Sequence, residues 1–306
     1  MSKRIVTAVA LIGAAGIISG CSLEQPSAGC IVQDSTDYPW QALYTPKAGD
    51  ETKACGKLRG EALGVWKYIE FEKGANEQLT KKRAYLGIRP EGLASRFAAT
   101  FKDEVLNADG TVKVDKDGKP VMAYVTEERV DNARDDNYAV AKAATAVSET
   151  LADEPDDKGL CATTGFKPAS VDAKEVIREN EVDGTTEQIV RAERLSYSFS
   201  NVMVYSDPSA PGTQLKATLR YTERQPDGTD CEAEYEVNAM WPQTGCDPES
   251  ESTAETCGAG SGINPDFDVR CEPALANTVV ADHEKDGTPI YWPGACVLNK
   301  PVPSFK

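Results

Sequence analysis

Nine cysteines are the residues whose spacing most constrains the chemistry of this 306-residue chain. A structural zinc site needs close Cys-x-x-Cys pairs or several histidine ligands. When Cys21 is set aside, the nearest cysteines are Cys246 and Cys257, eleven positions apart, and His283 is the only histidine. The pattern therefore disfavours a metal site and a bound cofactor. It favours oxidation of eight cysteines into up to four disulfides. The ninth, Cys21, belongs to the N-terminal segment described next. The eight are Cys30, Cys55, Cys161, Cys231, Cys246, Cys257, Cys271 and Cys296.

The segment that ends at Cys21 has the order of a secretory signal. Two basic residues, Lys3 and Arg4, precede fourteen apolar or small residues, and Ile18-Ser19-Gly20-Cys21 closes the run. A basic start, a short apolar core and a small-residue cleavage site are typical of such signals. The last four residues resemble the lipobox of bacterial lipoproteins, and the resemblance covers about twenty residues. It implies that Cys21 receives a diacylglycerol and that residues 1–20 are removed. The alternative is an ordinary signal with an accidental cysteine.

The same resemblance implies where the protein resides. One acyl chain holds a protein weakly on a bilayer, whereas lipoproteins of this kind usually carry three. In enteric relatives a serine after the cysteine, here Ser22, permits export to the outer membrane, and the side that the protein faces stays open. We expect residues 21–29 to form a short tether and residues 30–306 to form one body, with 30–160 and 161–306 as an optional division into subdomains.

Composition excludes some partners. Cleavage would leave 286 residues, enough for one large domain or two small ones. It would also change the net charge from −16 to −18, because only Lys3 and Arg4 are charged in the removed segment. A chain this acidic repels nucleic acid. The partners we expect are the bilayer, through acylated Cys21, and a protein or glycan of the envelope.

The sequence has no recognisable catalytic motif. A Ser-His-Asp mechanism needs a base, and His283 lies among Asp282, Glu284 and Asp286-Gly287, which is typical of an exposed turn. A glycosidase needs only two carboxylates and leaves no short motif, and the chain has 49 acids. The first functional prediction is therefore a non-enzymatic binding or structural component of the envelope. The alternative is an envelope hydrolase acting on carbohydrate through paired carboxylates, so whether the protein is an enzyme stays open.

Two further patterns have both a functional and a structural interpretation. Residues 107–118 resemble a calcium loop, but Val112 replaces the required glycine and Gly118 replaces the bidentate glutamate, so two hairpin turns are preferred. Trp40, Trp241 and Trp292 each stand beside a proline. They would suit a sugar-stacking platform, although buried core aromatics are the commoner outcome.

Alternating apolar residues predict the elements that must position these side chains. Strands are expected over 63–71 and 85–88, a hairpin over 111–125, and an antiparallel meander over 189–242. Within the meander, alternate residues from Cys231 to Trp241 should be buried, while Glu232, Glu234 and Glu236 face water. Apolar residues at helical spacing predict a helix over 137–152, and 172–180 suggests a second. Residues 247–262 should form a mobile loop.

The predicted fold class is α+β, predominantly antiparallel β. It would be a sandwich-like or half-barrel sheet with one or two packed helices, stapled by disulfides. Eight cysteines allow 105 pairings. Local loop closure favours Cys30–Cys55, Cys246–Cys257 and Cys271–Cys296, which leaves Cys161–Cys231 as the long-range bridge.

Overall fold

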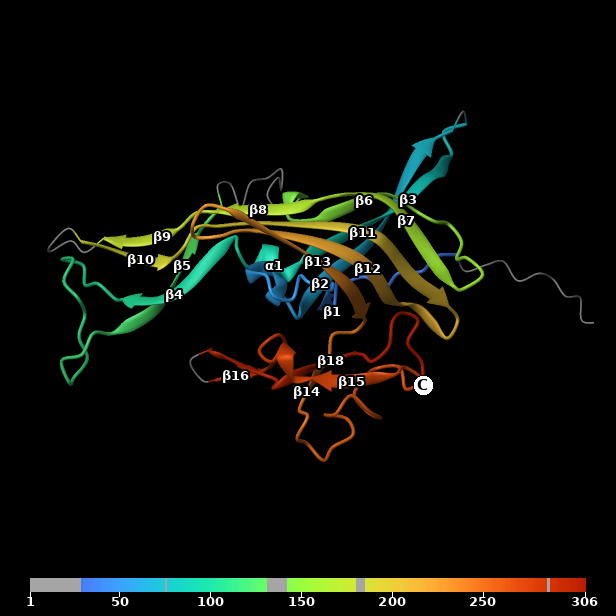
Figure 1. Ribbon diagram of the computed structural model, residues 1–306. Helices are drawn as coiled ribbons and strands as arrows, with labels where there is room; N and C mark the ends of the chain where they lie inside the picture. The colour runs from blue at the N-terminus through green and yellow to red at the C-terminus, as the bar shows by residue number, and fades with distance from the viewer. Residues whose placement is uncertain (1–28, 75, 131–141, 180–184, 285–286) are drawn as a thin grey trace, which may run out of the picture.

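The computed structural model describes residues 29–306, apart from residues 75, 131–141, 180–184 and 285–286. Its main feature is an antiparallel sheet in the order β12-β13-β1-β2-β3-β6-β7-β11-β8, shown in Figure 1. Strand β11 also pairs with β12, so eight strands close into a ring and β8 (Ala169–Ala173) extends from β11. The ring strands are β1 (Trp40–Pro46), β2 (Gly60–Lys73), β3 (Leu79–Pro90), β6 (Ala146–Leu151), β7 (Leu160–Lys167), β11 (Glu193–Asp207), β12 (Ala210–Arg224) and β13 (Asp230–Met240).

Alternation of side chains explains why the ring forms. Along β13, Ala233, Tyr235, Val237 and Ala239 are buried, whereas the carboxylate residues between them face outward. The inward row fills the ring, whose largest fully buried side chains include Trp40, Tyr44, Tyr197 and Tyr235. The antiparallel meander, the strands expected at 63–71 and 85–88, and the disulfide-stapled β-rich class are thus confirmed. The sheet is closed, which leaves the ring without a free edge.

The helix predicted over 172–180 is wrong, and the helix predicted over 137–152 is wrong from residue 146 onward. Residues 146–151, the end of the first predicted helix, form β6, and residues 131–141 lie outside the described part. Strand β6 is hydrogen-bonded to β3 on one side and β7 on the other, so tertiary pairing overrides the alanine-rich helical spacing. Residues 172–180 contribute to β8 and to β9 (Val176–Glu179) instead of a helix. Residues 142–143 are also helical, and the other helices described are single turns: η1 (Ala54–Lys57), α1 (Glu91–Ala94) and η2 (Pro273–Leu275).

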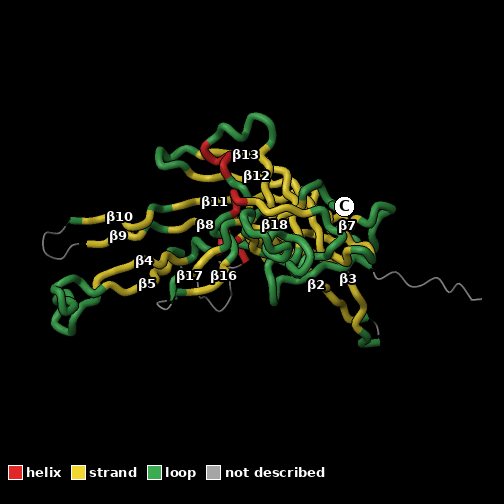
Figure 2. The backbone as a smooth tube through the Cα atoms, turned by 90° about the horizontal axis from the view of Figure 1, so that it is seen from below, coloured by secondary structure: helices red, strands yellow, loops and turns green. Residues whose placement is uncertain are grey.

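Three two-stranded arms project from the body, and Figure 2 shows them running in one direction. They are β4 (Ala98–Glu104) with β5 (Met122–Glu128), β9 with β10 (Thr186–Val190), and β16 (Val280–His283) with β17 (Pro289–Tyr291). The tip of the first arm has the two predicted turns, at Asn107–Gly110 and at Asp115–Gly118, where glycine takes the positive φ that each turn requires.

A smaller sheet lies below the ring in Figure 1 and is made of β14 (Gly245–Cys246), β18 (Gly294–Leu298) and β15 (Val269–Glu272). It has its own apolar cluster, which includes Phe267 and Leu298 and is contacted by Met240 at the end of β13. The ring takes strands from both sides of residue 160, whereas this sheet is built wholly from residues after 244. The division into 30–160 and 161–306 stays a prediction.

Candidate binding site

The structure joins all eight cysteines after residue 29 in disulfides, but every predicted pairing is wrong. The observed bridges are Cys30–Cys161, Cys55–Cys231, Cys246–Cys271 and Cys257–Cys296. The four cysteines up to Cys231 are bonded among themselves, and so are the four from Cys246 on. The predicted pairings fail because sheet closure, rather than the shortest loop, brings Cys30 to β7 and Cys55 to β13. The proposed lipid site, Cys21, lies outside the described residues.

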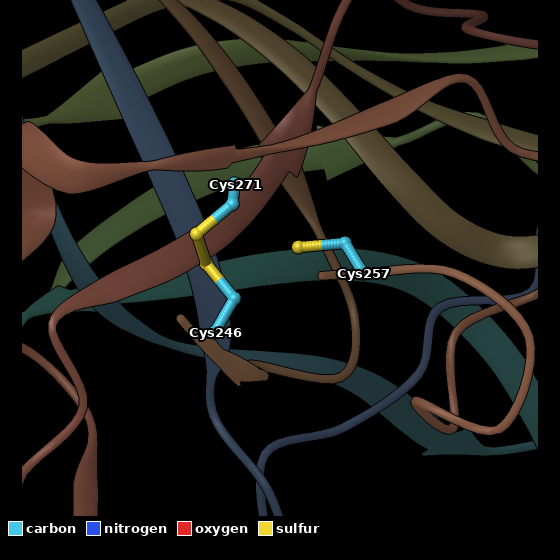
Figure 3. Close-up of side chains that lie close together, drawn as sticks. All are labelled: Cys246, Cys257 and Cys271. Atoms are coloured by element: carbon cyan, nitrogen blue, oxygen red, sulfur yellow. A yellow bond between two sulfur atoms is a disulfide. The ribbon is translucent and has the colours of Figure 1, made fainter. Parts of the chain in front are cut away.

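A cluster of sulfur atoms lies at the centre of the C-terminal sheet. The Sγ atoms of Cys246, Cys257 and Cys271 all lie within 4.8 Å of one another, as Figure 3 shows. Each of them is bonded to another sulfur, so none is the thiolate that a metal ion would need. The cluster is therefore two disulfides packed side by side, and the loop at 247–262 is attached through Cys257 to β18 rather than closed on itself.

An open cleft of about 630 Å³ lies beside this sheet and is walled by three aromatic residues, Tyr38, Trp241 and Trp292. The Tyr38 side chain is 58% exposed and meets Trp241 edge-on, with the ring centroids 6.5 Å apart. The indole nitrogen of Trp241 donates a hydrogen bond to the Tyr38 carbonyl oxygen at 3.0 Å. Two of the three tryptophans considered for a stacking platform thus lie at one site, while Trp40 is a core residue.

The backbone around the cleft fixes the aromatic rings. A Cβ atom on Gly245 would lie 2.1 Å from Cδ1 of Trp292, so only glycine lets this ring rest on β14. The opposite wall is the 254–262 segment, in which Gly260 and Gly262 have positive φ values. The Cys257–Cys296 bridge attaches that segment to β18. One disulfide therefore attaches this segment of the wall to the smaller sheet.

Polar groups lie between the aromatic walls. Gln243, Thr244, Glu255 and Ser261 line the cleft. The Gln243 side-chain amide donates to Oε1 of Gln41 at 2.8 Å, which fixes its orientation. Aromatic faces combined with a few oriented polar groups are the usual composition of a site for a small or oligomeric polar ligand.

Glu61, at the start of β2, is a second unusual group that sequence reasoning missed. It continues the inward row of Leu63 and Val65, so alternation alone would have found it. Its carboxyl group accepts hydrogen bonds from the Tyr44 hydroxyl at 3.0 Å and from the Gly92 backbone N–H in α1. Burial raises the pKa of Glu61 to about 7, against the lowering effect of these hydrogen bonds. The carboxyl group links three elements inside the ring, which indicates a structural role.

We expect this carboxyl group to make stability fall as pH rises. A carboxyl whose folded-state pKa lies above its unfolded value of about 4.5 favours folding while protonated, and that contribution is lost as pH rises toward and past 7. Between pH 5 and pH 8 the free energy of unfolding should decrease by about 2 to 3 kcal/mol from this group. Urea unfolding at the two pH values measures it. Glu61→Gln should remove most of the pH dependence, and Glu72→Gln, at an exposed position of the same strand, should keep it. An unchanged pH dependence in Glu61→Gln would contradict this assignment.

A second hollow, of about 510 Å³, lies over β8 and β11 and includes two carboxylates, Asp172 and Asp230. The Asp230 carboxylate is paired with the Arg224 guanidinium at 3.0 Å. This hollow therefore gives no particular support to a mechanism with two free carboxylates.

The described features together define a class, a disulfide-stapled antiparallel β protein. Comparison with known proteins identifies the family. The MlpA family model matches residues 38–242, from Tyr38 of the cleft to the end of β13 and Pro242, and the chain belongs to this family. It is 32% identical over 311 residues to "Putative lipoprotein MlpA" of Myxococcus xanthus, with 100% of both chains covered. No solved structure matches the chain. Among the described residues, no helix has the length and apolarity needed to cross a bilayer.

Proposed function

We propose that this lipoprotein is a non-enzymatic binding component of the cell envelope, held on the outer membrane by acylated Cys21. The sequence Ile18-Ser19-Gly20-Cys21 supports the attachment, and Ser22 supports the outer membrane. A 32% identical relative that is named as a lipoprotein supports the same anchoring. Within this role, the cleft walled by Tyr38, Trp241 and Trp292 would be the binding site.

The ligand class we propose for the cleft is an envelope glycan. A sugar ring has apolar C–H faces and hydroxyl edges, so it suits a site with aromatic faces and oriented amide and hydroxyl groups. The wall residue Tyr38 is mostly exposed, so its ring is accessible to a ligand. Among the described residues that line the cleft, Glu255 is the single carboxylate, and its side chain accepts from the Ser250 hydroxyl at 2.6 Å. The arrangement favours binding, since paired-carboxylate hydrolysis needs a second acid in the same site.

Removal of the Trp292 side chain should abolish most of the affinity for a glycan. Titration with soluble peptidoglycan glycan strands and with N-acetylglucosamine oligosaccharides, followed by calorimetry, measures the dissociation constant. We expect Trp292→Ala to weaken binding tenfold or more, because an aromatic anchor in a binding site typically contributes about 2 kcal/mol. Tyr38→Ala, at a mostly exposed position, should weaken it several-fold without affecting the fold.

The matched control is Trp66→Ala. Trp66 is a tryptophan of β2 whose ring lies over Gly64, and it does not line the cleft. Equal affinities for the Trp292 and Trp66 variants would refute the cleft as the site. Failure of the unmodified protein to bind any of these saccharides would refute the glycan proposal.

A further inference from the structure

The β2–β3 hairpin extends beyond the ring that it helps to form. Strand β1 pairs with β2 only as far as Leu63, and β6 pairs with β3 only as far as Ala84. Beyond these points the two strands pair only with each other, up to Lys73 opposite Leu79, with one register shift between Glu70 and Phe71. In Figure 1 the hairpin points to the upper right, away from the β4–β5 and β9–β10 arms at the left.

One face of this extension is apolar and basic. Phe71 lies opposite Lys81, and Lys73 lies opposite Leu79, and cross-strand partners share a face of the sheet. Ile69 is two residues before Phe71, so it lies on that face as well. The exposed fractions of Ile69, Phe71 and Leu79 are 46%, 54% and 66%. These residues continue the inward-facing row of β2. Beyond the ring, however, no described strand packs across from them, so their side chains stay exposed.

The other face of the hairpin has ordinary surface chemistry. Glu70 forms salt bridges with Lys82 and Arg83, each at 2.6 Å. The Tyr68 and Tyr85 rings stack there with centroids 5.2 Å apart. Acidic and basic charges are therefore balanced on one face. The opposite face combines three large apolar side chains with Lys73 and with Lys81, which is paired with the Asp153 carboxylate, in a chain of net charge −16.

The hairpin emerges beside the attachment point of the N-terminal tether. The Lys67 ammonium group donates to the Cys30 carbonyl oxygen at 2.5 Å. The Cys30 N–H donates to the carbonyl oxygen of Asp153 at 2.9 Å, and the Asp153 carboxylate pairs with Lys81 of the hairpin. Phe71 is four strand residues beyond Lys67, which is about 13 Å.

Chain geometry places this face within reach of the lipid. Nine residue steps separate Cys21 from Cys30, which limits their separation to about 30 Å. A bilayer that holds acyl chains on Cys21 is therefore close enough for the hairpin, about 13 Å beyond Cys30, to contact its surface. Apolar side chains at the acyl boundary with lysines at the headgroup phosphates are typical of interfacial segments.

We propose that the face formed by Ile69, Phe71, Lys73, Leu79 and Lys81 docks on the bilayer to which Cys21 is attached. This inference rests on the proposed acylation of Cys21. The hairpin would be a second contact with the membrane, and it would fix the orientation of the body. The three arms project from the side of the body opposite to the hairpin (Figures 1 and 2). The arms and the cleft would then point away from the bilayer or run parallel to its surface.

Depth-dependent quenching tests the contact. The full-length lipidated protein is placed in phosphatidylcholine vesicles whose acyl chains are brominated, and the fluorescence of Phe71→Trp is compared with that of the unmodified protein. We expect the tryptophan added at position 71 to lose half or more of its emission. The control is Tyr124→Trp on β5, because Tyr124 is 50% exposed on the arm at the opposite side. Its added emission should be unaffected.

The possible outcomes separate the two proposals. Labelled palmitate that is incorporated equally into the unmodified protein and Cys21→Ser would overturn the lipid site. If acylation depends on Cys21 and the added tryptophan of Phe71→Trp is quenched no more than that of Tyr124→Trp, the hairpin inference alone is overturned. Shielding of the added tryptophan of Phe71→Trp from both brominated lipid and aqueous iodide would assign the face to a second copy or another protein, which also overturns it. Selective quenching of that tryptophan by lipid supports the inference.

Discussion

Replacing Cys55 and Cys231 together by alanine should lower the free energy of unfolding by about 5 kcal/mol, the largest stability effect expected of any single bridge here. The two cysteines are 176 residues apart, so their bond removes much of the freedom of the unfolded chain. The bridge also attaches η1 to the start of β13, where the ring closes. Urea unfolding of the oxidised protein, compared with the double variant, measures the loss.

The matched control is the double alanine variant of Cys246 and Cys271. These cysteines are only 25 residues apart, and the same chain-entropy relation gives about 3.5 kcal/mol for their bridge. The long bridge should therefore contribute more than the short one by about 1.5 kcal/mol. A larger loss from the short bridge would show that native contacts, rather than loop closure, determine the contribution of each disulfide.

Tyr235→Ala should cost roughly 3 to 5 kcal/mol, the range for truncating a large buried aromatic side chain. Tyr235 is fully buried in the ring, and its hydroxyl donates to the Cys55 carbonyl oxygen at 2.5 Å and accepts from the Leu58 N–H at 3.2 Å. Truncation would leave a cavity and remove the partner of two backbone groups. Denaturant unfolding at fixed pH gives the change directly.

Two variants separate the causes of that loss. Tyr235→Phe keeps the ring and removes only the hydroxyl, so it should cost about 1 to 3 kcal/mol from the backbone groups left without a partner. Glu236→Ala, at the exposed neighbouring position, should change stability by less than about 0.5 kcal/mol. A large loss at Glu236 would mean that the alternation of β13 does not determine which residues stabilise the fold. Because Tyr235 contacts Cys55, its effect and that of the disulfide should not add.

The alternation of buried and exposed residues along the strands was the part of the fold that the sequence predicted well. The alternation from Ala233 to Ala239 is strict because one side faces the ring and the other faces water. The failure at 146–151 has another origin. Val147 and Leu151 continue an apolar spacing typical of a helix, whereas pairing with β3 and β7 holds these residues in a strand. Closure of the sheet depends on pairing between strands as distant as β1 and β13, which no local pattern records.

The candidate site was predictable only in part. Tryptophan beside proline indicated Trp241 and Trp292, but nothing local places Tyr38, 203 residues earlier, against Trp241. The disulfides failed for the same reason. Cys271 and Cys296 lie directly opposite each other on β15 and β18. Nevertheless, Cys271 is bonded to Cys246, and Cys296 is bonded to Cys257. Within one cluster of sulfur atoms, sequence spacing does not decide which two are joined.

Under the export proposed above, the long bridges also set an order of events for a chain that crosses the membrane N-terminus first. Cys30 and Cys55 reach the oxidising side long before their partners, Cys161 and Cys231. Oxidation in order of arrival would join the first two to each other and prevent the ring from closing. Correct maturation therefore requires that these thiols stay reduced until about two hundred residues have followed them across, or that a thiol-disulfide isomerase exchanges the early bond. The yield of native protein should thus depend on the exchange capacity of the compartment more than on its oxidising power.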